Sequence, residues 1–200
     1  MTEKIIIELN DIRLEGVFKT SDSNFGAIIT HPHPEYGGNM HNSVVMAIEQ
    51  AYQSKGYATL RFNFRGTGGS TGNYDTFNDL CNDVIAAYDF IKGRGFADIA
   101  LAGYSFGSWV NAHTETILNG LIHQLLVSPP VSFMDFTKIN GFSCDSFVIC
   151  GDKDEYAKLP DIKNHIEKWQ TEHFEIIKGC DHFYSGMIGQ LNSIIDQLLQ

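Results

Sequence analysis

The sequence predicts an α/β protein built on a mostly parallel sheet whose first two strands are antiparallel. Short apolar runs alternate with longer segments of helical spacing along almost the whole chain. Some of these runs, such as LLVS and FVIC, are apolar on both faces, which suits strands covered by helices on each side of a sheet. The two opening runs instead alternate, and Asn10 and Asp11 between them suit a tight hairpin.

The expected elements follow from these patterns in chain order. Strands are predicted where β-branched or apolar runs are short, and helices where apolar residues recur at helical spacing. The expected strands are 5–9, 12–18, 26–30, 58–64, 99–104, 125–128, 147–150 and 174–178. The expected helices are 43–54, 77–91, 108–117, 160–169 and 187–199.

The organisation of the chain is that of a single domain, residues 1–200. Its composition, 43% hydrophobic and 19% charged, is typical of an ordinary soluble globular protein. No internal repeat, low-complexity tract or linker interrupts the alternation of strands and helices. The longest irregular stretch, residues 129–143, is too short to form a separate lid domain.

The charge pattern excludes several kinds of partner. The chain has 14 Lys and Arg and 24 Asp and Glu, which gives a net charge of −10. The basic residues do not cluster into a stripe that could bind the phosphate backbone of a nucleic acid. No run reaches the roughly 20 apolar residues of a membrane span, and the N-terminus lacks the apolar core of a signal peptide. We therefore expect a cytoplasmic protein that binds neither nucleic acid nor membrane, with its four cysteines reduced. The sequence does not predict its oligomeric state.

Ser105 lies between two glycines in GYSFG, after an apolar run and before a segment of helical spacing. This is the arrangement of a nucleophile elbow, a tight strand-to-helix turn that exposes a serine hydroxyl above a sheet. Gly103 and Gly107 would let the strand and helix backbones pass close together, and the turn would impose a positive φ on Ser105. The position between strand and helix favours this interpretation over an ordinary glycine-rich turn.

A serine nucleophile needs a histidine base and a carboxylate that orients it, here in the chain order serine, acid, histidine. The last two expected strands lead into GDKDEY and GCDHFY, at the same edge of the sheet as Ser105. The second loop supplies His182 as the base. The first offers Asp154, with Asp152 and Glu155 as competitors that the sequence does not separate.

Backbone N–H groups must stabilise the oxyanion of a tetrahedral intermediate. The first expected donor is Phe106, directly after the nucleophile. The second should come from HPHPEYGGN, whose prolines stiffen the loop but have no N–H to donate. His33, Glu35 and Tyr36 remain as donors, and we favour the backbone of Glu35.

Two other groups of residues have the composition of a nucleotide-binding loop and of a metal site, but their spacing does not fit either kind of site. The glycines of RGTGGSTG do not match a nucleotide-binding pattern, so we interpret this loop, with Arg65, as a structural brace. His31, His33, His41 and Cys180 are metal-ligating types, but they lack zinc-site spacing. We therefore expect no metal and no cofactor.

Several stretches together resemble the α/β-hydrolase superfamily: GAIITHPHPEYGGNMHN, RFNFRGTGGSTG, GYSFGS, GDKDE and CDHF. More narrowly, the chain is similar to small bacterial hydrolases with an HPHP-x-x-GG loop, related to dienelactone hydrolases and serine aminopeptidase-like proteins. The resemblance implies an eight-stranded sheet, Ser105 as nucleophile, Asp154 as acid and His182 as base, and it also points to Glu35. Dienelactone hydrolases carry cysteine where this chain has Ser105, so their lactone substrate is not carried over.

The expected activity is that of a serine hydrolase cleaving a small carboxylic ester or thioester through an acyl-enzyme. Without a lid domain, the cleft should be open and shallow. The candidate substrate-binding residues are Tyr36, Met40, Trp109, Phe133 and Phe183. The alternatives are an amide or peptide hydrolase, an acyltransferase with the same triad, and a non-catalytic binding protein on this fold.

Overall fold

The computed structural model describes residues 1–74 and 76–199 of the chain. Within these residues, one eight-stranded sheet has the strand order β1-β2-β4-β3-β5-β6-β7-β8. The strands are β1 (Thr2–Leu9), β2 (Ile12–Lys19), β3 (Phe25–Thr30), β4 (Ala58–Phe62), β5 (Asp98–Tyr104), β6 (Leu121–Val127), β7 (Asp145–Gly151) and β8 (His173–Ile177). The helices are α1 (Ser43–Ser54), α2 (Phe77–Gly93), α3 (Phe106–Thr114), α4 (Leu159–Trp169) and α5 (Ile188–Leu198), with a short 3-10 helix, η1 (Pro34–Tyr36).

The predicted hairpin forms between β1 and β2. Leu9 pairs with Ile12, so the loop contains two residues, and Asn10 adopts the positive φ of 53° that such a turn favours. Strand β2 also pairs antiparallel with β4, and β3 to β8 run parallel. The mostly parallel sheet with an antiparallel start is confirmed.

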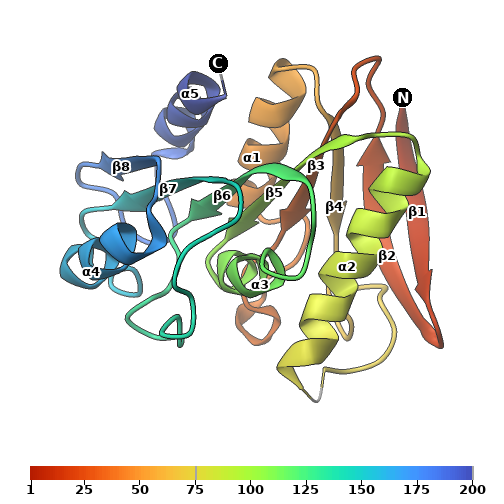
Figure 1. The fold of residues 1–200 in the computed structure, drawn as a ribbon, viewed down its shortest axis with the longest axis horizontal. Coiled ribbons are helices and arrows are strands. Elements are labelled where there is room, and N and C mark those ends of the chain that lie inside the picture. Colours follow the sequence, from red (N-terminus) through yellow and green to blue (C-terminus); the bar gives the residue numbers. More distant parts are fainter. Residues whose placement is uncertain (75, 200) are drawn as a thin grey trace.

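Helices cover both faces of the sheet, as the two-sided apolar strands predict (Figure 1). Helices α1 and α5 pack together on one face, and α2 packs beside α3 on the other. The parallel strands therefore end at a common edge, where the loops after β3, β5, β7 and β8 meet. This edge carries the candidate site.

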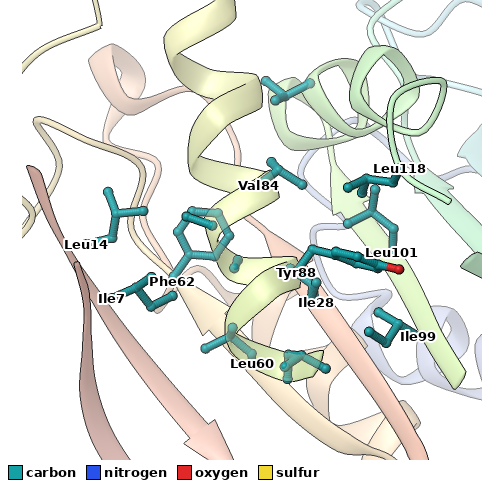
Figure 2. Packing of buried hydrophobic residues seen from close by; sticks show 14 of the residues in the cluster. Ile7, Leu14, Ile28, Leu60, Phe62, Val84, Tyr88, Ile99, Leu101 and Leu118 are labelled. Carbon is teal, nitrogen blue, oxygen red and sulfur yellow. The ribbon is translucent and has the colours of Figure 1, made fainter. Parts of the chain in front are cut away.

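A hydrophobic core joins α2 to the strands beneath it (Figure 2). Val84 and Tyr88 point from α2 toward Ile28, Leu60 and other strand residues, and these side chains are almost completely buried. Full burial of one such side chain stabilises the fold by about 1.5 to 3 kcal/mol, an upper estimate because unfolded chains also bury surface. The core therefore gives rigid support to the strand ends.

The segment between β6 and β7 contains turns and bends but no helix or strand. It covers residues 128–144 and inserts no additional domain, in agreement with the expected lidless hydrolase fold. No helix among the described residues is long and apolar enough to cross a membrane. Cys81, Cys144, Cys150 and Cys180 carry free thiols.

Candidate active site

Ser105 forms the tight turn between β5 and α3, with φ 53° and ψ −118°. The predicted positive φ is confirmed. A Cβ on Gly103 would lie 2.7 Å from the backbone carbon of Gly107, and a Cβ on Gly107 would lie 2.5 Å from Thr30 Oγ1. Both positions therefore require glycine, because the α3 backbone passes directly over the ends of β3 and β5.

Ser105, His182 and Asp154 form a continuous hydrogen-bonded chain. The Oγ atom of Ser105 lies 2.8 Å from His182 Nε2, and His182 Nδ1 lies 2.8 and 2.9 Å from the two carboxylate oxygens of Asp154. All three side chains are buried. Because ionised Asp154 only accepts hydrogen bonds, Nδ1 carries a proton, and neutral His182 then has Nε2 free to accept the proton of Ser105.

The loop after β7 explains why Asp154 rather than its neighbours meets the histidine. Asp152 turns toward the next loop, where its Oδ1 accepts the Gly179 N–H at 2.6 Å. Glu155 is exposed. The structure therefore separates three carboxylates that the sequence leaves open.

Burial is the largest single influence on the pKa of Asp154 and raises it, but the hydrogen bond from His182, the attraction of that imidazole when it is protonated, and the hydrogen bonds from Ala157 and Ser128 together lower the pKa below its usual value. Oδ1 also accepts the Tyr156 and Ala157 N–H groups at 2.9 and 2.8 Å. Ser128 adds a smaller contribution in the same direction. Asp154 is thus ionised near neutral pH and can stabilise a positively charged imidazole.

Aromatic rings surround the His182 imidazole. The ring centroid of Tyr156 lies 4.7 Å from that of His182, and those of Tyr104 and Phe183 lie 5.6 Å away. Tyr104 also donates its hydroxyl to the His182 backbone carbonyl at 2.8 Å. Sequence reasoning missed Tyr104 and Tyr156, although Tyr104 directly precedes Ser105 and Tyr156 follows Asp154 by two positions.

The N–H of Phe106 belongs to the first turn of α3, where backbone donors lack partners within the helix. In the HPHP loop, the Glu35 N–H donates to His33 Nδ1 at 3.2 Å, and the Tyr36 N–H donates to the His33 carbonyl. No hydrogen bond within the described residues uses the His33 N–H. His33 also packs its ring against Phe106 at 4.6 Å between centroids. Of the three candidate donors, His33 therefore has the uncommitted N–H.

Polar side chains in the loop after β4 connect it to helix α2 and to the loop after β3. Arg65 donates to Asp83 through Nε and Nη2 at 2.9 and 2.7 Å, and through Nη1 to Asp79 at 2.9 Å. The structure thus gives Arg65 the brace-like contacts that the sequence suggests. Nearby, the Met40 N–H donates to Asn63 Oδ1 at 2.8 Å.

A cavity of about 300 Å³ opens beside Ser105 and His182. Of the predicted substrate-binding residues, Tyr36, Phe133 and Phe183 line it, whereas Met40 and Trp109 are outside its lining. Met40 is buried, and Trp109 packs against the core and donates Nε1–H to the Asp135 carbonyl. The other lining residues are Pro32, His33, Gly37, Gly38, Asn42, Tyr104, Phe106, Pro130, Met134 and Tyr156.

The histidines considered as metal ligands lie in separate environments. His31 is buried, and its Nε2 accepts a hydrogen bond from the Phe64 N–H. The Nδ1 atom of His41 lies 3.2 Å from Nη1 of Arg61. Across residues 1–74 and 76–199, no cluster of three or more His, Cys, Asp or Glu side chains is arranged to hold a metal ion.

Comparison with known proteins agrees with this architecture. No protein-family model matches the chain. It is 30% identical over 200 residues to an uncharacterized protein of Rickettsia prowazekii, covering 94% of this chain and 84% of that protein. The structure of an α/β serine hydrolase homologue from Coxiella burnetii is similar with a TM-score of 0.92 and 29% identity, over 99% of this chain and 97% of the other. The chain belongs to the α/β-hydrolase superfamily, and its fold is that of a hydrolase.

A more distant similarity covers part of the chain. Over 82 residues it is 33% identical to the mitochondrial palmitoyl-protein thioesterase ABHD10 of Bos taurus. This match spans 40% of the present chain and 26% of the bovine protein.

Proposed function

We propose that the chain hydrolyses a small carboxylic ester or thioester through a covalent acyl-enzyme, with Ser105, His182 and Asp154 as the catalytic triad. The main support is the 2.8 Å contact between Ser105 Oγ and His182 Nε2, with the ionised Asp154 carboxylate on the opposite side of the imidazole. A serine hydroxyl becomes an effective nucleophile when such a base accepts its proton.

In the first half of the reaction, Ser105 Oγ attacks the acyl carbonyl while His182 accepts its proton. Asp154 stabilises the resulting imidazolium. The N–H groups of Phe106 and His33 donate to the oxyanion, and we prefer His33 to Glu35 because the Glu35 N–H is already bonded to the His33 ring. Collapse of the intermediate expels the alcohol or thiol, which takes the proton from His182.

In the second half, His182 removes a proton from water, and the hydroxide formed attacks the acyl-serine. The second tetrahedral intermediate collapses to release the carboxylic acid, and the proton returns to Ser105. These reaction steps require no metal or organic cofactor.

The cavity supports a small, uncharged substrate. Among the residues that the structure describes, the lining contains no Lys, Arg, Asp or Glu, and the cavity volume is at the lower end of the range for small-molecule sites. Tyr36, Phe133 and Phe183 are 77%, 59% and 64% exposed. Water can therefore reach the acyl-enzyme, which favours hydrolysis over transfer to another acceptor. The partial similarity to a palmitoyl-protein thioesterase keeps thioesters within the proposed class.

The first test is the mass of the intact protein after treatment with a fluorophosphonate probe. The wild type should gain one adduct, and the Ser105→Ala and His182→Ala variants should gain none. Folded wild type without an adduct would contradict the proposal and favour a non-catalytic binding protein.

A second test identifies the acid with small aryl esters and thioesters. Asp154→Asn should lower kcat by about 10³- to 10⁴-fold, since it removes the charge that orients and stabilises the imidazole. Asp152→Asn is the matched control because its carboxylate bonds the Gly179 N–H instead of His182. Equal losses in both variants would contradict the role of Asp154, and faster cleavage of the matched amides would favour an amidase.

A further inference from the structure

Strand β1 forms one edge of the sheet, far along the sheet from the loops that carry Asp154 and His182 (Figure 1). Its side chains alternate in exposure. Ile5, Ile7 and Leu9 pack on the core, whereas Lys4 and Ile6, on the other face of the strand, are exposed. An exposed edge with apolar residues is a template for pairing with another strand.

The backbone groups available for such pairing can be identified from the hairpin. The Thr20 N–H donates to the Met1 carbonyl, and residue pairs of β1 and β2 keep one register throughout. Because alternate residues of an antiparallel pair share hydrogen bonds, odd-numbered residues of β1 direct their backbone groups to β2. The backbone N–H and C=O groups of the even-numbered residues therefore point away from β2, toward the open edge of the sheet. These residues are Thr2, Lys4, Ile6 and Glu8.

This edge is complementary to itself in one antiparallel register. With Ile6 opposite the partner's Ile6, outward backbone groups meet, and Lys4 lies opposite the partner's Glu8 at two symmetric positions. Opposite charges that face each other across strands stabilise pairing, and like charges oppose it. Registers centred on Lys4 or on Glu8 would place like charges opposite each other. Charge thus selects the register centred on Ile6.

A groove beside β1 provides apolar surface for the same contact. It has a volume of about 340 Å³ and lies between β1 and α2. Its lining is mostly apolar, with Ile6, Ile7, Leu9, Ile85, Ala86 and Phe90, and it also contains Glu8, Asn82 and Asp89. In the register centred on Ile6, Ile5 and Ile7 of the partner would extend this apolar surface on the α2 side of the sheet.

The opposite edge of the sheet lacks this complementarity. Strand β8 has five residues, and Glu175 is at its centre and exposed. Symmetric pairing of two β8 strands about their centres would place these carboxylates opposite each other. The two edges therefore differ in their capacity to pair with a second copy.

We propose that two copies of this chain associate through antiparallel pairing of their β1 strands, centred on Ile6, to form a continuous sheet across the dimer. The surface is a single strand edge with a shallow groove, so the interface is small and the dimer reversible. The net charge of −10 on each copy opposes association, and salt at physiological strength screens this repulsion.

The test is sedimentation velocity of the full chain from about 5 to 200 μM in 150 mM salt, which screens long-range charge. Wild type should shift reversibly from 22.3 kDa toward twice that mass. Lys4→Glu and Glu8→Lys should each raise the dissociation constant at least tenfold, because each creates two like-charge pairs. The double variant should restore the wild-type constant within about threefold.

Ile6→Pro supplies an independent variant. Proline removes the outward N–H of Ile6 but no hydrogen bond to β2, so the chain should fold and stay monomeric. Circular dichroism and aryl-ester turnover check the fold of every variant, and they also separate this proposal from the proposed function because β1 is remote from Ser105. The Glu8 contact with Arg13 is exposed and contributes little to stability.

The opposite results would overturn the proposal. A wild-type protein that remains monomeric over the whole concentration range would contradict the proposed dimer, whether β1 is unpaired or binds another protein. A dimer that persists in Ile6→Pro, or single charge variants that the double variant does not rescue, would assign association to another surface.

Discussion

The hydroxyl of Tyr104 donates to the backbone carbonyl of His182 across 2.8 Å, and both residues are buried. Tyr104 is the last residue of β5 and directly precedes Ser105. The strand that leads into Ser105 thus also holds the loop of His182, so the separation of these two residues depends on one hydrogen bond as well as on the packing of both elements.

Tyr104→Phe should lower kcat/KM for a small aryl ester by at least about fivefold, because the His182 loop loses its anchor while the ring is kept. The free energy of unfolding should fall by about 1 to 3 kcal/mol, the cost of an unsatisfied buried carbonyl. The matched control is Tyr88→Phe. The Tyr88 hydroxyl donates to the Asn119 carbonyl at 2.6 Å, and this hydrogen bond lies away from the candidate site. That variant should lose stability but keep its turnover, and equal turnover losses would contradict the anchor.

Tyr156→Leu should lower kcat about fivefold with little change in KM, because the ring beside His182 stabilises the imidazolium that forms in the transition state. Tyr156→Phe should retain most of the activity, since it keeps the ring. The measurement is kcat and KM of both variants at one pH near neutrality. A similar loss in both would assign the effect to the hydroxyl instead.

Gly107→Ala should prevent folding or lower the free energy of unfolding by several kcal/mol, because its Cβ would lie within 2.7 Å of the Thr30 backbone. Gly93→Ala is the matched control, at the end of α2 with nothing within 4 Å of the new Cβ. It should be neutral or stabilising by up to about 1 kcal/mol. Chemical denaturation measures both, and a stable Gly107→Ala protein would contradict the close approach.

Acid should destabilise the protein between pH 6.5 and 4. Burial lowers the pKa of His31 and His123 to about 4, whereas both bind protons near pH 6.5 when unfolded. The unfolded state therefore takes up more protons as the pH falls through this window, at a cost of about 3 kcal/mol for each histidine. Stability should be greatest above pH 6.5.

His123→Gln should make the loss of unfolding free energy between pH 7 and 4.5 smaller by about 2 kcal/mol than in the wild type. Denaturant titrations across this range measure the difference. An unchanged slope in His123→Gln would show that His123 does not contribute to acid sensitivity.

Much of the fold was predictable because strand and helix periods are strong signals in this chain. The expected helices 43–54 and 160–169 agree closely with α1 and α4. Ser105 and His182 stood out because each follows a strand whose carboxyl end should reach the same edge of the sheet. The order of the strands in the sheet had no local signal, since it depends on contacts between residues distant in sequence.

The details of the site depended on loop geometry that spacing does not encode. Asp152 and Asp154 are two positions apart, and only the turn after β7 directs Asp154 to His182. The sequence favoured Glu35 as a donor, but η1 turns its N–H toward the His33 ring. Met40 is a predicted cleft residue, but its backbone N–H donates to Asn63 Oδ1 and its side chain is buried outside the cavity lining.

The backbone of Ser105, with φ 53° and ψ −118°, is a conformation that glycine adopts with little strain and serine adopts at a cost of about 1 to 3 kcal/mol. Ser105→Gly would relieve this strain while deleting the hydroxyl. A mutant library screened only for resistance to heat would therefore enrich glycine at position 105, and one screened for turnover would reject it. Under the proposed function, thermal tolerance and turnover favour different residues at position 105, so directed evolution of the chain needs both screens at once.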